Sequence, residues 1–171
     1  MIVLGLDPGT RHFGWGVVER RGTRLVHRAH GIVHSSEKLT IAMRLVGIER
    51  ELVTVVEAHG PTVASCEAIF YAKDPQAAAK LGHARGVGLL VCARAGLEVF
   101  EYPPATVKRA VAGHGRAEKS QVAMMVKVIL GLSAPPEADS ADALALAVTH
   151  LQHMPLMASG GAPGIRQVPR G

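Results

Sequence analysis

The chain has 171 residues, a length that suits one domain and disfavours any mechanism that needs two full lobes. Its composition, 48% hydrophobic and 19% charged, is that of a folded protein, and with only 4% aromatic residues the core should consist mostly of aliphatic side chains. We expect no membrane-spanning helix, since no apolar run approaches the roughly 20 residues that a span requires, and no secretory signal. Cys66 and Cys92 both lie in apolar runs and are interpreted as small buried residues, a usage typical of a reducing cytoplasm.

The net charge of +5 is concentrated in the middle of the chain. Residues 70–127 carry +5, whereas residues 1–69 carry +1 and residues 128–171 carry −1. A basic segment between ends that contain acids favours a polyanionic ligand held against a carboxylate site. A solvated basic surface explains the charge excess equally well.

Apolar periodicity predicts an α/β chain in which three strands are followed by a helix, a strand, a helix and a fifth strand. The predicted strands are residues 2–6, 13–18, 23–33, 62–66 and 97–102. The predicted helices are residues 35–59, 75–95, 104–111, 118–130 and 138–151. We expect residues 1–153 to form one domain, and residues 154–171, rich in Gly and Pro without periodicity, to form a flexible tail.

Four acids stand where predicted strands end or a predicted helix begins. They are Asp7, Glu67, Asp139 and Asp142. The last two are three residues apart and therefore share one face of a helix. If the strand ends and the helix start converge, the carboxylates repel one another unless cations are present, and carboxylate oxygens without Cys or His are ligands for Mg²⁺ or Mn²⁺. Each acid alone also has an ordinary explanation as a turn former, a solvated strand end or a first-turn acid.

Several segments in matching order resemble the RuvC family of bacterial Holliday junction resolvases over about residues 1–153. They are Leu4-Gly-Leu-Asp-Pro-Gly-Thr10, Gly14-Trp-Gly16, Glu67-Ala-Ile-Phe70, Leu81-Gly-His-Ala-Arg-Gly86, Ala117-Glu-Lys-Ser-Gln-Val122 and Ala138-Asp-Ser-Ala-Asp-Ala-Leu-Ala145. The resemblance implies a ribonuclease-H-like fold with a mixed five-stranded sheet. It also implies a homodimer that cuts two opposing strands of a four-way DNA junction symmetrically, in recombination and repair. Two Mg²⁺ ions per site are expected, with Mn²⁺ as a substitute, and the branch-migration proteins RuvA and RuvB as partners.

The resemblance also assigns residues around that site. It makes Asp7, Glu67, Asp139 and Asp142 the metal-binding catalytic acids. Some members have a histidine at one of the last two positions, whereas both are Asp here, so an all-carboxylate site is expected. Phe70 matches an aromatic residue that we expect to stack on bases at the opened junction. Lys108 and Lys119 match lysines near the scissile phosphate, where they would hold phosphate or stabilise developing charge. Four further cations are expected to contact backbone phosphates, with solvated surface charge as the alternative: Lys73, Lys80, Arg85 and Arg116.

Glycines within the predicted helix over residues 75–95 need an explanation, because each costs about 1 kcal/mol relative to alanine. In the family this helix packs at the two-fold interface, so Gly82 and Gly86 are predicted dimer contacts. Close packing against the protein's own sheet is the alternative. The histidine pairs His27 with His30 and His150 with His153 lack a neighbouring ligand set and are interpreted as surface or interface residues.

Two other functions are compatible with parts of the sequence. The Asp7-Pro-Gly-Thr10 turn also resembles a phosphate loop of actin-like and sugar-kinase ATPases, but those proteins need a second lobe and a second Asp-Gly loop. A junction-binding protein without catalysis is the third possibility, although four clustered acids would then carry an electrostatic cost without a role.

Overall fold

The computed structural model describes residues 1–68 and 75–154 of the chain. In chain order its elements are β1 (Ile2–Asp7), β2 (His12–Arg21), β3 (Arg24–His34), α1 (Ile41–His59), β4 (Val63–Glu67), α2 (Pro75–Arg94), β5 (Glu98–Tyr102), α3 (Pro104–Ala112), α4 (Lys119–Leu130) and α5 (Ala138–His153). The predicted order of strands and helices is confirmed. None of the described helices combines the length and the apolar character needed to cross a lipid bilayer. The expected tail lies outside the described residues, apart from Met154.

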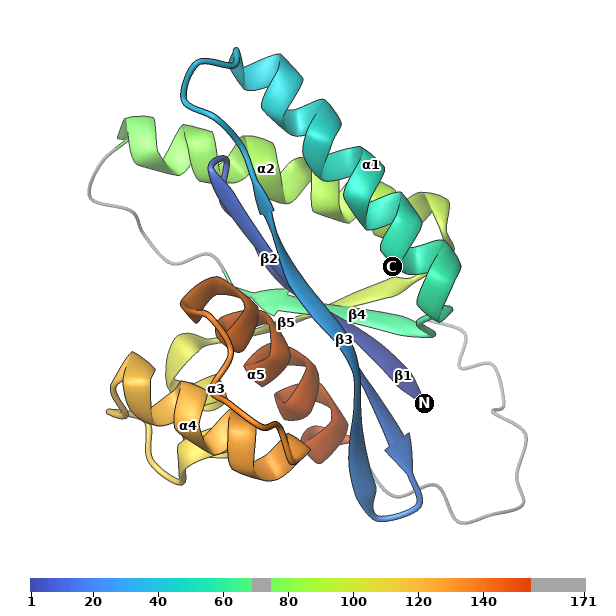
Figure 1. Ribbon diagram of the computed structural model, residues 1–171, viewed down its shortest axis with the longest axis vertical. Helices are drawn as coiled ribbons and strands as arrows, with labels where there is room; N and C mark the ends of the chain where they lie inside the picture. The colour runs from blue at the N-terminus through green and yellow to red at the C-terminus, as the bar shows by residue number, and fades with distance from the viewer. Residues whose placement is uncertain (69–74, 155–171) are drawn as a thin grey trace, which may run out of the picture.

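The five strands form one mixed sheet in the order β3-β2-β1-β4-β5 (Figure 1). The first three strands pair antiparallel, whereas β4 lies parallel to β1 and β5 parallel to β4. Parallel neighbours end at the same edge of a sheet, and the register pairs Leu6 of β1 with Cys66 of β4. The residues that follow this pair, Asp7 and Glu67, are therefore brought next to each other.

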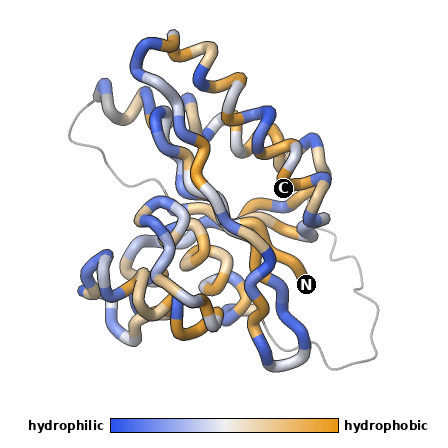
Figure 2. Tube along the Cα trace, viewed as in Figure 1, coloured by the Kyte–Doolittle hydropathy of each residue, from blue (hydrophilic) through white to orange (hydrophobic). Residues whose placement is uncertain are grey.

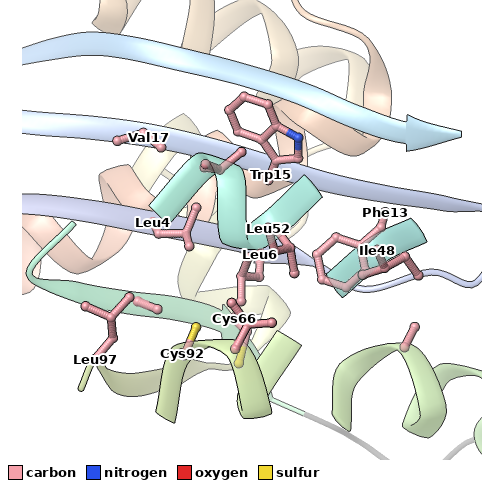
Figure 3. Packing of buried hydrophobic residues seen from close by; sticks show 14 residues of the cluster. Leu4, Leu6, Phe13, Trp15, Val17, Ile48, Leu52, Cys66, Cys92 and Leu97 are labelled. Atoms are coloured by element: carbon pink, nitrogen blue, oxygen red, sulfur yellow. The ribbon is translucent and has the colours of Figure 1, made fainter. Parts of the chain in front are cut away.

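Helices cover both faces of the sheet, and each face has its own hydrophobic core (Figure 1). On one face the side chains of α1 and α2 share a core with those of β1, β2 and β4. Hydrophobic and hydrophilic residues alternate along α1, as in a helix that covers a sheet (Figure 2). The labelled side chains of this core are Leu4, Leu6, Phe13, Trp15, Val17, Ile48, Leu52, Cys66, Cys92 and Leu97 (Figure 3). The predicted burial of both cysteines is confirmed, since each is 1% exposed, and burial raises the pKa of the Cys92 thiol to about 12.

The other face carries α3, α4 and α5, with α5 lying directly against β1 and β2. Three strand glycines permit this approach. A Cβ on Gly5 would overlap the carbonyl of Ala143, a Cβ on Gly14 would overlap the carbonyl of Asp139, and a Cβ on Gly16 would lie 2.7 Å from the side chain of Leu144. Because Gly14 pairs with Asp7 in the β1–β2 register, its missing side chain brings the start of α5 over the end of β1.

The first helix begins later than its periodicity predicted. β3 continues to His34, the backbone N–H of Lys38 donates to the Ser36 hydroxyl in a turn, and α1 begins at Ile41. Thr40 caps the helix, because its hydroxyl accepts a hydrogen bond from the backbone N–H of Met43. The prediction of a start at Ser35 was wrong, since local serine and threonine hydrogen bonds stabilise a turn ahead of the helix.

Candidate active site

Three elements converge on the edge of the sheet where β1 and β4 end. Asp7 is the last residue of β1 and Glu67 the last residue of β4. Asp139 and Asp142 lie in the first two turns of α5, one helical turn apart on one face. Sheet register therefore determines the position of the first two acids, and the packing of α5 on the strand glycines determines that of the other two.

Asp7, Glu67 and Asp142 line one cleft of about 240 Å³ together with two lysines, Lys108 of α3 and Lys119 of α4. Its apolar walls are Pro104, Val107, Val122 and Leu146. Three carboxylates and two ammonium groups thus face one space between the sheet edge and the helices α3, α4 and α5. An arrangement of this kind binds groups in which anionic oxygens and cations meet, such as a phosphodiester with a metal ion.

Asp139 lies at the side of this cleft and does not line it. Its Oδ2 is 3.6 Å from Nδ1 of His12, the first residue of β2, and the His12 ring makes an edge contact with the ring of His34. Asp139 is nevertheless close enough to Asp7 for its charge to raise the Asp7 pKa. His12 is a neighbour of the acids that the sequence did not indicate, because only the pairing of β2 with β3 and the placement of α5 bring it there.

The electrostatics of the site are those of crowded carboxylates. Burial raises the pKa of Asp7 from 3.8 to about 7, and the negative charges of Asp142 and Asp139 add to the effect. Burial also raises the pKa of Glu67, and the charge of Asp142 adds to the effect, while Lys119, Lys108 and Arg85 oppose the shift. In the absence of a further cation, the site therefore holds more negative charge than its surroundings stabilise.

Lys119 partly compensates this excess negative charge. Its Nζ donates a hydrogen bond of 2.7 Å to Oδ2 of Asp142, and this contact raises the pKa of the ammonium group. The lysine is the first residue of α4, and its side chain is 74% exposed at the mouth of the cleft. Glu118 and Gln121 form a capping box that fixes the start of α4 immediately beside it. Lys119 thus presents a cation that an incoming phosphate would reach.

The donor set fits a divalent cation such as Mg²⁺ or Mn²⁺. The ligand atoms in the cleft are carboxylate oxygens. Burial and the charges of Asp142 and Asp139 raise the pKa of Asp7, so a cation at this place would stabilise its ionised form. Within residues 1–68 and 75–154, no group of three or more His, Cys, Asp or Glu side chains is already arranged to hold an ion. Asp142 contacts Lys119 and Asp139 contacts His12, so two of the four candidate ligands already have a side-chain partner.

Arg85 is buried, whereas its predicted contact with a backbone phosphate requires an exposed side chain. Its side chain is only 7% exposed, and its guanidinium is bonded to the backbone carbonyl of Glu67 and to the carboxylate of Glu101. The prediction was wrong because a residue in the middle of a covering helix points its charge inward here, where two oxygen acceptors compensate its burial. The sequence carried no signal for this, since Glu101 comes from a different strand.

The remaining predicted DNA contacts fall into two groups. Lys80 on α2 and Arg116 ahead of α4 are exposed, as a phosphate contact requires. Phe70 and Lys73 lie outside the described residues.

The two glycines predicted at the dimer interface are exposed on the outer face of α2. A Cβ on Gly82 or on Gly86 would meet nothing within 4 Å. Packing of these glycines against the protein's own sheet, the alternative explanation, is therefore wrong. Gly88 instead lies against the sheet, where a Cβ would come within 3.2 Å of Phe13.

The two histidine pairs differ in burial. His27 and His30 are half-buried on β3 with 2.7 Å between Nε2 and Nδ1. His150 is fully buried, with Nδ1 2.8 Å from the Tyr102 hydroxyl and its ring against Phe100, so its interpretation as a surface or interface residue was wrong. It packs under β5 because α5 covers that part of the sheet.

Comparisons with known proteins agree with this geometry. A family model described as crossover junction endodeoxyribonuclease RuvC matches residues 3–150. The protein of that name from Sorangium cellulosum is 54% identical over 166 residues, which cover 95% of this chain and 93% of the relative, and the one from Afipia carboxidovorans is 48% identical over 151 residues, which cover 88% of each. The structure of Thermus thermophilus RuvC in complex with Holliday junction substrate superposes with a TM-score of 0.83 and 37% identity, covering 88% of this chain and 93% of that one.

Proposed function

The chain belongs to the RuvC family of crossover junction endodeoxyribonucleases and is an endonuclease that resolves four-way DNA junctions in recombination and repair, and we propose that it cuts with the carboxylates gathered where β1, β4 and α5 meet. These are Asp7, Glu67, Asp139 and Asp142. The observation that carries the proposal is the single cleft in which three of them face two lysines. The fold is ribonuclease-H-like, as the resemblance implied.

The family's activity depends on divalent metal. We propose two Mg²⁺ ions per active site, replaceable by Mn²⁺, with the four acids as ligands. When bound, such ions activate a water molecule and stabilise the departing 3′ oxygen. The support from this chain is the all-oxygen donor set and the burial and crowding of carboxylates that raise the pKa of Asp7.

The lysines of the cleft take a separate role. Lys119 and Lys108 would hold the scissile phosphate by its non-bridging oxygens and stabilise the charge that develops there, since both ammonium groups line the same space as the acids. The exposed Lys80 and Arg116 would contact phosphates of the junction arms without reading sequence. Phe70 stacking on an unpaired base and Lys73 on a phosphate belong to the same proposal.

The proposal extends to a homodimer with α2 at the two-fold axis. Open space above Gly82 and Gly86 supports it, because two helices without side chains at these positions approach closely. A symmetric dimer presents two identical sites to a junction that is itself nearly two-fold, which accounts for paired cuts. RuvA and RuvB as partners, a cytoplasmic location, and residues 1–153 as the nuclease domain complete the proposal.

The test is cleavage of an end-labelled synthetic four-way junction, with and without Mg²⁺, by the wild type and by Asp7→Asn. Metal-dependent nicks at symmetric positions in two opposing strands are expected from the wild type alone, with junction affinity retained in the variant. Equal cutting by both proteins would exclude Asp7 from the chemistry. Tight binding without nicks under any metal would favour a junction-binding protein. ATP hydrolysis without nicking would favour the ATPase alternative.

A further inference from the structure

One buried cation lies beside the acids at the active-site edge of the sheet, where it lines a second cleft with Asp7 and Glu67. Arg85 comes from the middle of α2, and its side chain is 7% exposed. One terminal nitrogen donates a hydrogen bond of 2.7 Å to the backbone carbonyl of Glu67, and the other is 2.6 Å from Oε1 of Glu101. A single guanidinium thus joins α2, the end of β4 and the neighbouring strand β5.

The carbonyl that Arg85 binds is at the place where the sheet's own pairing ends. The β1–β4 register ends at Leu6 and Cys66, one residue before Glu67. On the other side, the last β4–β5 pair is Glu67 with Tyr102, after which the backbone N–H of Ala68 donates to the Tyr102 carbonyl. The guanidinium therefore supplies a hydrogen bond to Glu67 where β1 no longer pairs with β4.

The pairing with Glu101 explains how the buried charge of Arg85 is stabilised. A buried guanidinium is costly unless oxygen acceptors surround it, and the Glu101 carboxylate, 51% exposed, supplies the compensating charge at the surface. The planar fork of arginine lets two nitrogens reach two acceptors in fixed directions, which a lysine ammonium on a flexible chain does less well. The buried Arg85 guanidinium is thus held in a fixed position between two acceptors, unlike the charged group of a surface ion pair.

We propose that Arg85 is a positioning residue for the reaction, one that fixes the backbone of Glu67 so that the Glu67 carboxylate faces the metal-binding cleft, and that Glu101 holds Arg85 in place. The proposal rests on the proposed function of Glu67 as a metal ligand. Partners that orient a ligand from behind commonly affect metal affinity or activity about 10- to 100-fold when they are lost. Because Arg85 is buried and occupied, its loss should leave the affinity for junction phosphates unchanged.

The experiment compares Arg85→Met, Arg85→Lys and Glu101→Gln with a matched control. Arg94→Met removes another arginine of the same helix, one whose partner is Glu49 on α1, 2.8 Å away. Three quantities are measured for each protein: the junction dissociation constant in EDTA at fixed salt, the Mg²⁺ concentration for half-maximal single-turnover cleavage, and the rise in melting temperature caused by Mn²⁺. The last needs no catalysis.

For Arg85→Met we expect at least about a 10-fold increase in the half-maximal Mg²⁺ concentration and a reduced Mn²⁺-induced rise in melting temperature, with the junction dissociation constant within about 2-fold of the wild type. Arg85→Lys should restore part of the metal response, Glu101→Gln should lose part of it, and Arg94→Met should match the wild type. If Arg85→Met fails to fold, Arg85→Lys and Glu101→Gln decide the matter by the same measurements.

Two results would overturn the proposal. A weaker junction affinity with an unchanged metal response would make Arg85 a DNA contact, and an unchanged value of all three quantities would leave it without a positioning role. If the wild type does not cleave under any condition, the proposed nuclease fails. The Mn²⁺-induced rise in melting temperature would still show whether Arg85 orients the metal-binding acids.

Discussion

The substitution Asp7→Asn separates two consequences of crowding carboxylates in one site. In the metal-free protein, burial and the charges of Asp142 and Asp139 raise the pKa of Asp7 from 3.8 to about 7. Asparagine has nearly the same shape without the charge, so it removes the repulsion together with a proposed metal ligand. We expect the variant to be more stable than the wild type without metal and inactive with it, a trade-off typical of active sites.

The sign of the pH dependence follows from proton binding. Between pH 3.8 and about 7 the folded state keeps the Asp7 proton that the unfolded chain has released. The free energy of unfolding of the wild type therefore falls as the pH rises through this window. The difference in pKa corresponds to about 4 kcal/mol, which is the upper limit of the increase in the free energy of unfolding on substitution at pH 8. At pH 5 the increase is less than about 2 kcal/mol.

The assay is thermal unfolding in EDTA at pH 8 and at pH 5. A domain of this size changes its melting temperature by about 2–4 °C per kcal/mol, so the variant is expected to melt higher than the wild type at pH 8, by up to about 16 °C for the upper limit of about 4 kcal/mol, with a smaller rise at pH 5. Glu51→Gln, which removes an exposed carboxylate of α1, is the matched control for the change in net charge and should leave the melting temperature unchanged.

A variant equal to or less stable than the wild type at pH 8 would refute the reasoning. So would a stability difference that does not narrow between pH 8 and pH 5, because it would show that Asp7 ionisation is not its source.

Three further predictions concern packing, assembly and DNA binding. Gly14→Ala should lower the free energy of unfolding by more than about 2 kcal/mol and abolish cleavage, because its Cβ would overlap the Asp139 carbonyl. The control Gly47→Ala, which has open space around its Cβ, should change neither quantity in chemical denaturation and the nicking assay. Gly82→Leu should leave the melting temperature of the protomer unchanged or higher, but in sedimentation analysis it should convert the proposed dimer to a monomer. A dimer that persists in this variant would show that the interface does not include this face of α2. Junction affinity should fall steeply with salt, and Lys80→Gln should reduce the slope of log affinity against log salt by about 1, whereas an unchanged slope would remove Lys80 from the phosphate contacts.

Local patterns made much of this chain predictable. Apolar runs and Gly or Pro breaks predicted the order of the elements, and the Gly and Pro stop after His59 coincides with the end of α1, where Gly60 adopts a left-handed conformation with φ of 55°. The acids drew attention because Asp7, Glu67 and Asp139 stand at the ends or starts of elements and Asp142 shares a helix face with Asp139, and the resemblance to the RuvC family assigned all four to one site. Errors arose where hydrogen bonds over a few residues decided the outcome, as in the turn after Ser36 that delays α1 to Ile41.

Other features depended on contacts between distant parts of the chain. Arg85 is 18 residues from Glu67 in sequence, and its charge suggested a surface role until the packing of α2 turned it inward. His12 acquired an acidic neighbour only because α5 lies over β2. The glycines of β1 and β2 carried a signal, since a glycine inside a strand often marks a close approach, but the partner was not identifiable from sequence spacing.

By itself, the sequence determined which residue types are available for the chemistry and on which ends of elements they stand, because strand and helix periodicity are local properties. Only the tertiary structure decided the charge of the site and what supports it. A carboxylate such as Asp7 acquires a pKa of about 7 from burial and from neighbours on α5, and an arginine such as Arg85 becomes a brace because two strand ends offer it oxygen acceptors. Both effects depend on distances between segments remote in the chain, which come into existence only when the helices pack on the sheet.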